Sequence, residues 1–259
     1  MKGNMKTKTN LVLLVAILFA ACDSLAAHDG KRLDIVVINN QLYAQGYLSG
    51  TDPIDDGGGI VRPYLNVVHG HLSNVGSTIA NSTLPGFDLD LDNAPQLLGH
   101  DLTLSLMGAG KWDEPPRQDG TGLAQDFGTP VLSDLSVGEL LSISFRIESI
   151  STDNPGSITL GSDISEDLPD LDPTYEVNLQ PDNVIYFLEW ELSTSNPDIL
   201  ASETIYTIHS PPGVGPEERL HFQSLALERH FGIQAVPEPG SVCLIALAGA
   251  SLLMVRRRS

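Results

Sequence analysis

Cysteine is almost absent from this sequence. Its two cysteines, Cys22 and Cys243, lie near opposite ends of the chain, and the 208 residues from 28 to 235 contain none. A body without cysteine cannot form disulfides, bind zinc through thiolates or use a cysteine nucleophile. Its stability must come from the burial of apolar side chains, and a chain of this length suffices for one sizeable core.

Basic residues are also scarce. The chain has 14 Lys and Arg against 33 Asp and Glu, which gives a net charge of −19. Residues 1–27 and 236–259 each carry a net charge of +2, so the body between them carries −23. Such an acidic surface repels nucleic acid and anionic lipid, and neither is an expected partner of the body. It suits the binding of divalent cations outside the cell, although solubility alone explains it equally well.

The common catalytic signatures are missing. The sequence has no Gly-x-Ser-x-Gly, no His-Glu-x-x-His and no phosphate-binding loop. Aromatic residues make up only 6% of the chain, so most of them are expected in the core. Trp112 and Tyr64 are the candidates for stacking on sugar rings. The sequence therefore favours a non-enzymatic protein over an enzyme.

The N-terminal region has the features of a secretory signal peptide. An uncharged apolar segment spans residues 11–21, and small residues follow it. They predict cleavage after Ala26 or Ala27, so residues 1–27 are the expected signal peptide. Lipidation of Cys22 is the alternative, and it ranks second because Phe19 is unusual at that position of a lipobox. Three lysines precede the apolar segment: Lys2, Lys6 and Lys8.

The C-terminal region predicts a membrane segment. Residues 241–255 are uncharged, and a helix of that length spans about 22 Å, short of the roughly 30 Å hydrocarbon core. Such a helix can still cross if the arginines that follow it extend to the interface. The positive-inside rule places these arginines in the cytoplasm and the body on the outer face. They are Arg256, Arg257 and Arg258.

The same tail resembles a known sorting signal. Pro237, Glu238 and Pro239, an apolar helix and a terminal arginine cluster follow one another as in the PEP-CTERM signal of Gram-negative bacteria. A buried core helix is the alternative, but prolines before it and arginines after it at the chain end disfavour that interpretation. The resemblance covers residues 236–259 only. It implies that an exosortase in the inner membrane processes the chain and passes it to the cell surface or extracellular matrix, where exopolysaccharide is an expected partner.

Short strands dominate the predicted body at residues 28–235. Apolar residues alternate with polar ones between turn signals, and neither βαβ spacing nor an internal repeat is present. The body is therefore expected to be all-β, as a single antiparallel β-sandwich or jelly roll. Residues 108–130 predict a long surface loop and a candidate binding loop, and residues 219–227 a strand or short helix. The expected strands are 33–38, 41–47, 61–71, 84–91, 101–107, 140–150, 157–160, 183–193 and 203–209.

Two acidic stretches are candidates for calcium. Asp88, Asp90 and Asp92 would line one side of an extended segment at intervals of roughly 6.6 Å, and calcium prefers such oxygen ligands. Neither stretch has the spacing of a known calcium loop, so a solvated strand face and a charged loop are the favoured interpretations. The second stretch contains Asp163, Glu166, Asp167, Asp170 and Asp172.

Histidines offer a second kind of metal site. His69 and His71 would lie on one face of a strand, and His100 could join them. Exposed polar residues beside a glycine are the favoured interpretation of this pair. If cleavage falls after Ala27, His28 becomes the N-terminal residue and could chelate copper. In that one residue the chain is similar to secreted copper oxygenases that act on polysaccharide.

Glu189 and Glu191 could form the carboxyl pair of a glycoside hydrolase. The alternative is that both face solvent while Trp190 packs inward. The function that the sequence predicts is an exported, PEP-CTERM-sorted, non-enzymatic module for binding or structure at the surface or in the matrix. The alternative is a secreted carbohydrate-active enzyme, hydrolytic through these glutamates or copper-dependent through His28.

Overall fold

The computed structural model describes residues 32–47, 61–74, 79–116, 127–178, 183–211 and 220–234. The predicted signal peptide, residues 1–27, and sorting segment, residues 236–259 with the membrane helix at 241–255, lie outside them. Within the described part of the chain, no helix is both long and apolar enough to cross a membrane.

Strands are the main secondary structure of the described body, which confirms the all-β prediction. A single turn of 3-10 helix, η1 (Pro95–Leu97), and one α-helix, α3 (His221–Phe231), are its helical elements. The strands are β1 (Arg32–Ile38), β2 (Gln41–Tyr47), β3 (Val61–Leu65), β4 (Val67–His71), β5 (Ser73–Asn74), β6 (Ala80–Ser82), β7 (Gly86–Leu89), β8 (Leu102–Asp113), β9 (Leu132–Ser133), β10 (Leu141–Phe145), β11 (Glu148–Ser151), β12 (Ser157–Gly161), β13 (Leu168–Leu171), β14 (Thr174–Val177), β15 (Val184–Thr194), β16 (Ile205–Ser210) and β17 (Ile233–Gln234).

The strands form three sheets. The β1 sheet has the order β13-β7-β1-β2-β3-β17, and the β10 sheet has the order β11-β10-β14-β6-β5. The β15 sheet has the order β12-β8-β15-β16-β4, with β9 paired to β8. β1 pairs with β7, and β4 with β16, in parallel. The prediction of purely antiparallel pairing is therefore wrong for these two pairs, because strands distant in sequence are placed side by side without a hairpin between them.

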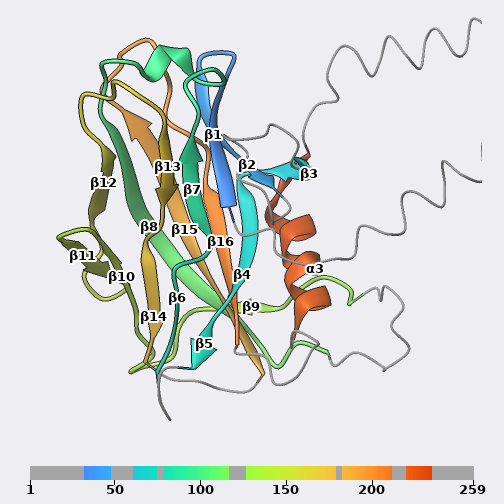
Figure 1. The fold of residues 1–259 in the computed structure, drawn as a ribbon. Helices are drawn as coiled ribbons and strands as arrows, with labels where there is room; N and C mark the ends of the chain where they lie inside the picture. Colours follow the sequence, from blue (N-terminus) through green and yellow to red (C-terminus); the bar gives the residue numbers. More distant parts are fainter. Residues whose placement is uncertain are drawn as a thin grey trace, which may run out of the picture.

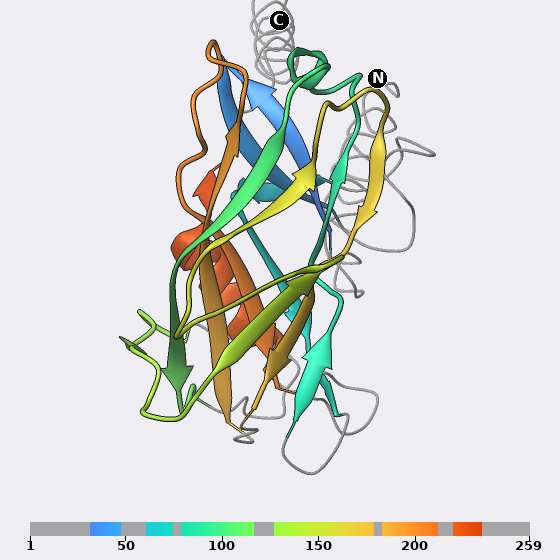
Figure 2. The ribbon, with the colours of Figure 1, turned by 90° about the vertical axis from the view of Figure 1, so that its left-hand side faces the viewer.

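The main core lies between the β15 sheet and the other two sheets. β10 and β14 cross in front of β15 and β16 in Figure 2, and the large core includes Trp190 of β15 and Tyr175 of β14. Along β15 the side chains of Tyr186, Leu188 and Trp190 point into this core. Period-two alternation of β15 thus assigns one face of the strand to the space between the sheets.

The opposite face of the β15 sheet is covered by α3. Figure 1 shows the helix beside β4 and β16, on the side away from β10 and β14. A smaller core fills this contact, in which Leu227 of the helix packs with Phe187 of β15 and Trp112 of β8. The undecided segment 219–227 is therefore helical over most of its length, because the apolar outer face of the sheet requires a cover.

The turn between β1 and β2 agrees with the prediction. β1 and β2 form an antiparallel hairpin in which Ile38 pairs with Gln41. Asn39 and Asn40 connect them with φ angles of 52° and 62°. A two-residue turn with both φ values positive favours asparagine and matches the twist of the strands.

Several sequence predictions are wrong in their boundaries. The strand predicted at 61–71 is divided at Asn66 into β3 and β4, which belong to different sheets. β8 runs on through Gly108 and Gly110, so the predicted surface loop at 108–130 begins only after Asp113. A Cβ atom at Gly110 would lie 2.4 Å from Cζ of Phe187, so glycine serves here to admit an aromatic ring from the neighbouring strand. The strand predicted at 140–150 is the hairpin β10–β11, which turns at Arg146 with φ 55° and leaves Ile147 fully exposed.

Candidate functional site

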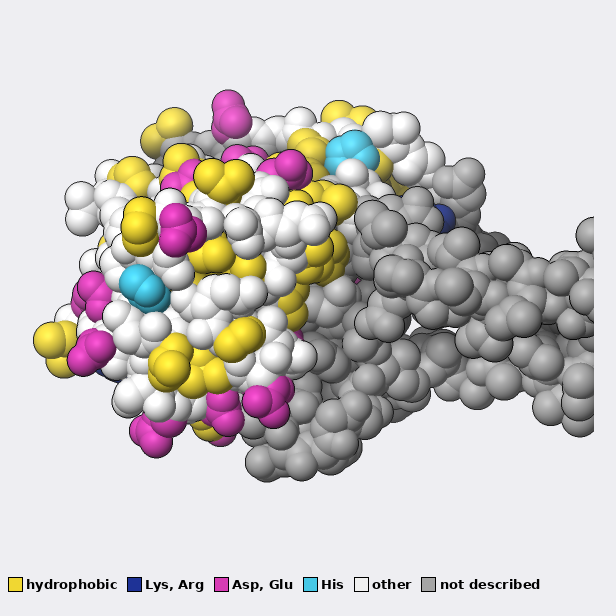
Figure 3. Space-filling view, turned by 90° about the horizontal axis from the view of Figure 1, so that it is seen from above, with side chains coloured by type: hydrophobic (Ala, Val, Ile, Leu, Met, Phe, Trp, Pro, Cys, Tyr) yellow, Lys and Arg dark blue, Asp and Glu magenta, His cyan; other side chains and the backbone are white. Residues whose placement is uncertain are grey.

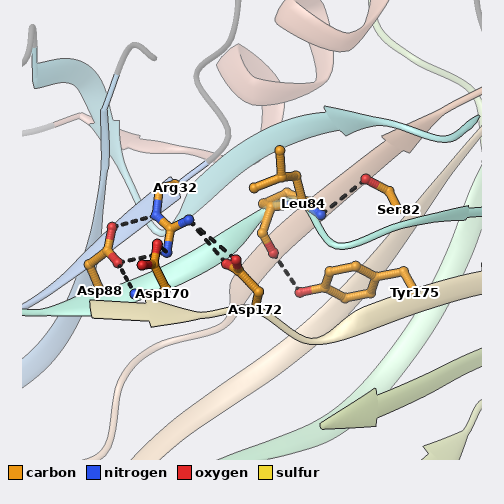
Figure 4. Close-up of polar contacts among 8 residues, drawn as sticks. Arg32, Ser82, Leu84, Asp88, Asp170, Asp172 and Tyr175 are labelled. Atoms are coloured by element: carbon orange, nitrogen blue, oxygen red, sulfur yellow. Dashed lines mark hydrogen bonds and ion pairs between the residues drawn. The ribbon is translucent and has the colours of Figure 1, made fainter. Parts of the chain in front are cut away.

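Among the described residues, a guanidinium group surrounded by three carboxylates forms the most highly charged contact. Arg32 Nε lies 2.6 Å from Asp88 Oδ2, and Arg32 Nη2 donates to Asp88 Oδ1 at 2.8 Å. Asp170 Oδ1 lies 2.9 Å from Nη2, and Asp172 Oδ1 lies 3.2 Å from Nη1. Figure 4 shows the three carboxylates pointing to this one side chain, which ties β1 to β7 and β13.

Burial sets the electrostatics of this cluster. It opposes the charge of Arg32, but the hydrogen bonds and the charge of Asp88 outweigh it, so the pKa of the guanidinium is raised. Burial also raises the pKa of Asp172; Arg32 opposes that rise, and the charge of Asp170 adds to it. Asp88 is fully buried, and the backbone N–H of Asp170 donates to its Oδ1 at 2.8 Å. The cluster is therefore a structural junction between three strands.

The structure separates the three predicted calcium ligands. Asp88 binds Arg32, whereas Asp90 accepts hydrogen bonds from the backbone of Asp92 at 2.8 Å and the side chain of Asn93 at 3.1 Å. β7 ends at Leu89 and a turn follows, so the strand alternation that would align the carboxylates stops there. Within the described segments, no group of three or more His, Cys, Asp or Glu could hold a metal ion.

The second acidic stretch is used in a similar way. Asp170 and Asp172 bind Arg32, and Asp167 Oδ1 accepts the backbone N–H of Leu91 at 2.8 Å. The prediction of a loop is wrong for its end, because residues 168–171 form β13. These carboxylates hold the edge of the β1 sheet together.

His69 and His71 do share a face of β4, the face that α3 covers. Nδ1 of His69 lies 2.8 Å from Oε1 of Glu228, which also accepts the backbone N–H of His69 at 2.9 Å. The two imidazole rings are 5.3 Å apart, and Nδ1 of His71 bonds Oγ of Ser210. His69 is 1% exposed, so the favoured interpretation of an exposed strand histidine is wrong for it. His100 does not join them.

The predicted hydrolytic pair lies on the outer face of β15. Glu189 and Glu191 are half-buried, whereas Trp190 between them is fully buried and donates from Nε1 to Oγ1 of Thr207 at 2.9 Å. The expected alternation around Trp190 is confirmed. The predicted copper ligand His28 lies outside the described residues.

The predicted sugar-stacking aromatics belong to the smaller core. Trp112 is 3% exposed and packs with Phe187 and Leu227, so it cannot stack on an external ring. Tyr64 is half-buried against the same cluster. The segment that contains Trp112 is therefore not the binding part of the predicted loop.

A pocket lies at the other end of that predicted loop. Its volume is about 210 Å³, and it opens between the segment 127–130 and the last turns of α3. One wall comes from Phe127, which packs on the smaller core, and from Gly128, Thr129 and Pro130. The opposite wall comes from Ala226, Arg229 and His230 of the helix. This pocket is the candidate functional site.

The pocket places one exposed arginine, Arg229, in the wall of a hollow of an acidic protein. Figure 3 shows carboxylates and apolar side chains spread over one end of the body, with almost no basic side chains on that face. Arg32 and Lys111 are engaged by carboxylates, with Nζ of Lys111 2.8 Å from Glu139. Arg229 is exposed, and none of the described carboxylates forms an ion pair with it. A guanidinium at the wall of a pocket is thus available to a ligand.

Sequence reasoning missed Arg229 and His230. Both occupy the last turn of α3, where basic side chains complement the helix dipole, so a structural reason for them also exists. Their basic character in a body of net charge −23 could have marked them as candidate site residues. They closely follow the segment 219–227, whose secondary structure the sequence left undecided. The role of residues 127–130 could be suspected only from the length of the predicted loop.

Comparison with known proteins does not assign this chain to a family. No protein-family model matches the chain, and a search of curated proteins found nothing similar.

Proposed function

We propose that this chain is an exported protein that its two terminal segments sort, and that its body is a non-enzymatic binding or structural module. The observation that carries the proposal is the order of parts in the tail: Pro237-Glu238-Pro239, an apolar stretch and three arginines. The signal-peptide pattern at the other end of the chain supports it independently.

The architecture of the body agrees with that destination. Its sheets pack face to face around a large apolar core without any cysteine, as in a β-sandwich of the jelly-roll type. Several of the polar residues that suggested chemistry act within the fold: Asp88 binds Arg32 and His69 binds Glu228. These uses support a module that presents a surface rather than a catalytic centre.

The proposed route defines the partners. An inner-membrane exosortase would process the chain near Pro237-Glu238-Pro239 while residues 241–255 anchor it. The body would then reach the cell surface or the extracellular matrix, where exopolysaccharide is the proposed ligand. Nucleic acid is not a proposed partner, because the charge of −23 would repel it.

Replacing Pro237, Glu238 and Pro239 together with alanine should block sorting. The full chain should then accumulate unprocessed in the inner-membrane fraction, because the sorting protease would lose its recognition segment while the apolar anchor remains. Immunoblots of cytosol, inner membrane and surface fractions measure this. The exposed Glu203 supplies a control, and Glu203→Ala should be sorted normally. Normal release of the triple variant to the surface would refute the proposed role of the tail.

A further inference from the structure

We propose that the pocket between residues 127–130 and the last turn of α3 binds a carboxylated sugar, with a uronic acid residue as the simplest example. The inference deepens the proposed function, because it rests on an exported body that meets polysaccharide. The ligand class itself is derived from the side chains that line the pocket.

Arg229 supplies the affinity for a carboxylate. A guanidinium presents its donors in a planar fork that matches the two oxygens of a carboxylate, and such charge-assisted pairs are stronger than neutral hydrogen bonds. No acidic side chain of the described segments forms an ion pair with Arg229, and its side chain is exposed at the wall of the pocket. His230, in the same wall, can donate a further hydrogen bond.

The opposite wall suits a sugar ring. Phe127 lines this wall while it packs on the smaller core, and the apolar face of a sugar can pack on an aromatic ring while its hydroxyl groups remain accessible. Thr129 adds a hydroxyl group that both donates and accepts hydrogen bonds. An aromatic ring and a hydroxyl on one wall, facing a cation on the other, match a ligand with an apolar face and one acid group.

Size and charge restrict the ligand further. A volume of about 210 Å³ suits a single compact unit rather than a large cofactor. The acidic remainder of the body would repel an anion at long range, but physiological salt screens exposed charges beyond about 8 Å. A short contact with Arg229 survives this screening better than the repulsion from distant carboxylates does.

A charged ligand and its neutral methyl ester test the inference. The probe is a trimer of galacturonic acid, and its methyl ester is the matched neutral ligand. Titration calorimetry with the purified full-length chain in a mild neutral detergent should show binding of the acid. The ester should bind about tenfold more weakly, since it loses the charge-assisted pair.

Substitution of the arginine locates the site. Arg229→Gln should weaken binding of the acid about tenfold and change binding of the ester far less. Arg146 is the matched control, because it is also exposed but lies in the turn of the β10–β11 hairpin. Its guanidinium carbon is 4.9 Å from the centre of the Phe145 ring. Arg146→Gln should bind both ligands as the unmodified chain does, and both variants should keep the unmodified unfolding transition.

Equal affinity of the unmodified chain for acid and ester, or no measurable binding of the acid, would overturn the inference. Unchanged acid binding by Arg229→Gln would do so too. These outcomes are distinct from a failure of the proposed function. A chain that binds the trimer but is not sorted refutes only the sorting route, and a chain that is sorted but does not bind refutes only the ligand.

Discussion

Replacing Arg32 with methionine is expected to lower the free energy of unfolding by about 3–5 kcal/mol. The substitution keeps the length of the side chain but removes the charge that Asp88 faces. Asp88 is fully buried, so its carboxylate would be left in the protein interior without its bidentate partner. The loss should weaken the contact between β1 and β7, because the pair of Arg32 and Asp88 links these two strands in addition to their backbone pairing.

Urea unfolding of the full-length chain, followed by tryptophan fluorescence, measures this loss, because Trp190 and Trp112 are both buried. Asp170→Asn is the matched control. The side chain of Asp170 is 70% exposed, so the loss of its ion pair with Arg32 should cost less than about 1 kcal/mol. Equal destabilisation by the two substitutions would contradict the assignment of Asp88 as the dominant partner.

The second large effect is acid destabilisation through His209. This residue of β16 is fully buried, its Nε2 lies 3.0 Å from Oγ1 of Thr207, and its ring lies 4.4 Å from that of Tyr175. Its Nδ1 has no hydrogen-bond partner among the described residues. Burial lowers the pKa of His209 from 6.5 to about 3.

The direction of the effect follows from proton binding. Between pH 6.5 and pH 3 the unfolded chain binds a proton at His209 and the folded chain does not, so stability falls as the pH falls. The contribution of this residue should be complete above pH 6.5 and should decrease by roughly 3 kcal/mol between pH 7 and pH 4. Other groups titrate in the same range, so the comparison has to be made with a variant.

His209→Leu removes the titrating group. The decrease in unfolding free energy between pH 7 and pH 4 should be smaller in this variant by about 3 kcal/mol. Thr207→Val is the control, since it removes the hydrogen-bond partner of His209 but keeps the imidazole, and the steep dependence on pH should persist. Parallel pH profiles for the His209→Leu variant and the unmodified chain would show that His209 is not a main source of acid sensitivity.

Local patterns predicted the strands well and their partners poorly. The β1–β2 hairpin follows from alternation around Asn39-Asn40. Ile205 and Ile208 of β16 are both buried as expected, but they lie on opposite faces of the strand, Ile205 in the main core and Ile208 in the smaller core. The parallel pairing of β4 with β16 joins segments more than 130 residues apart, and no local signal specifies it. Register between distant strands depends on the packing of the whole core.

The candidate site shows the same contrast between what local patterns predict and what depends on contacts between distant segments. Candidate metal sites were placed where acidic or histidine residues cluster in sequence, with exposed polar residues as the favoured interpretation, but Asp88 and His69 are buried and paired with Arg32 and Glu228. The partner of each is far away in the chain, so its structural use could not be inferred locally. The pocket brings residues 127–130 to Arg229, and that proximity arises only when α3 docks on the β15 sheet.

The central claim is that the two chain ends deliver this acidic β-domain beyond the inner membrane. Mass spectrometry of both termini of the protein recovered from the surface and matrix fraction tests it most directly. The chain should begin at Ala27 or His28 and should lack Arg256, Arg257 and Arg258. Recovery of the protein only as an intact chain in the cytosol, with Met1 and Ser259 present, would contradict the claim.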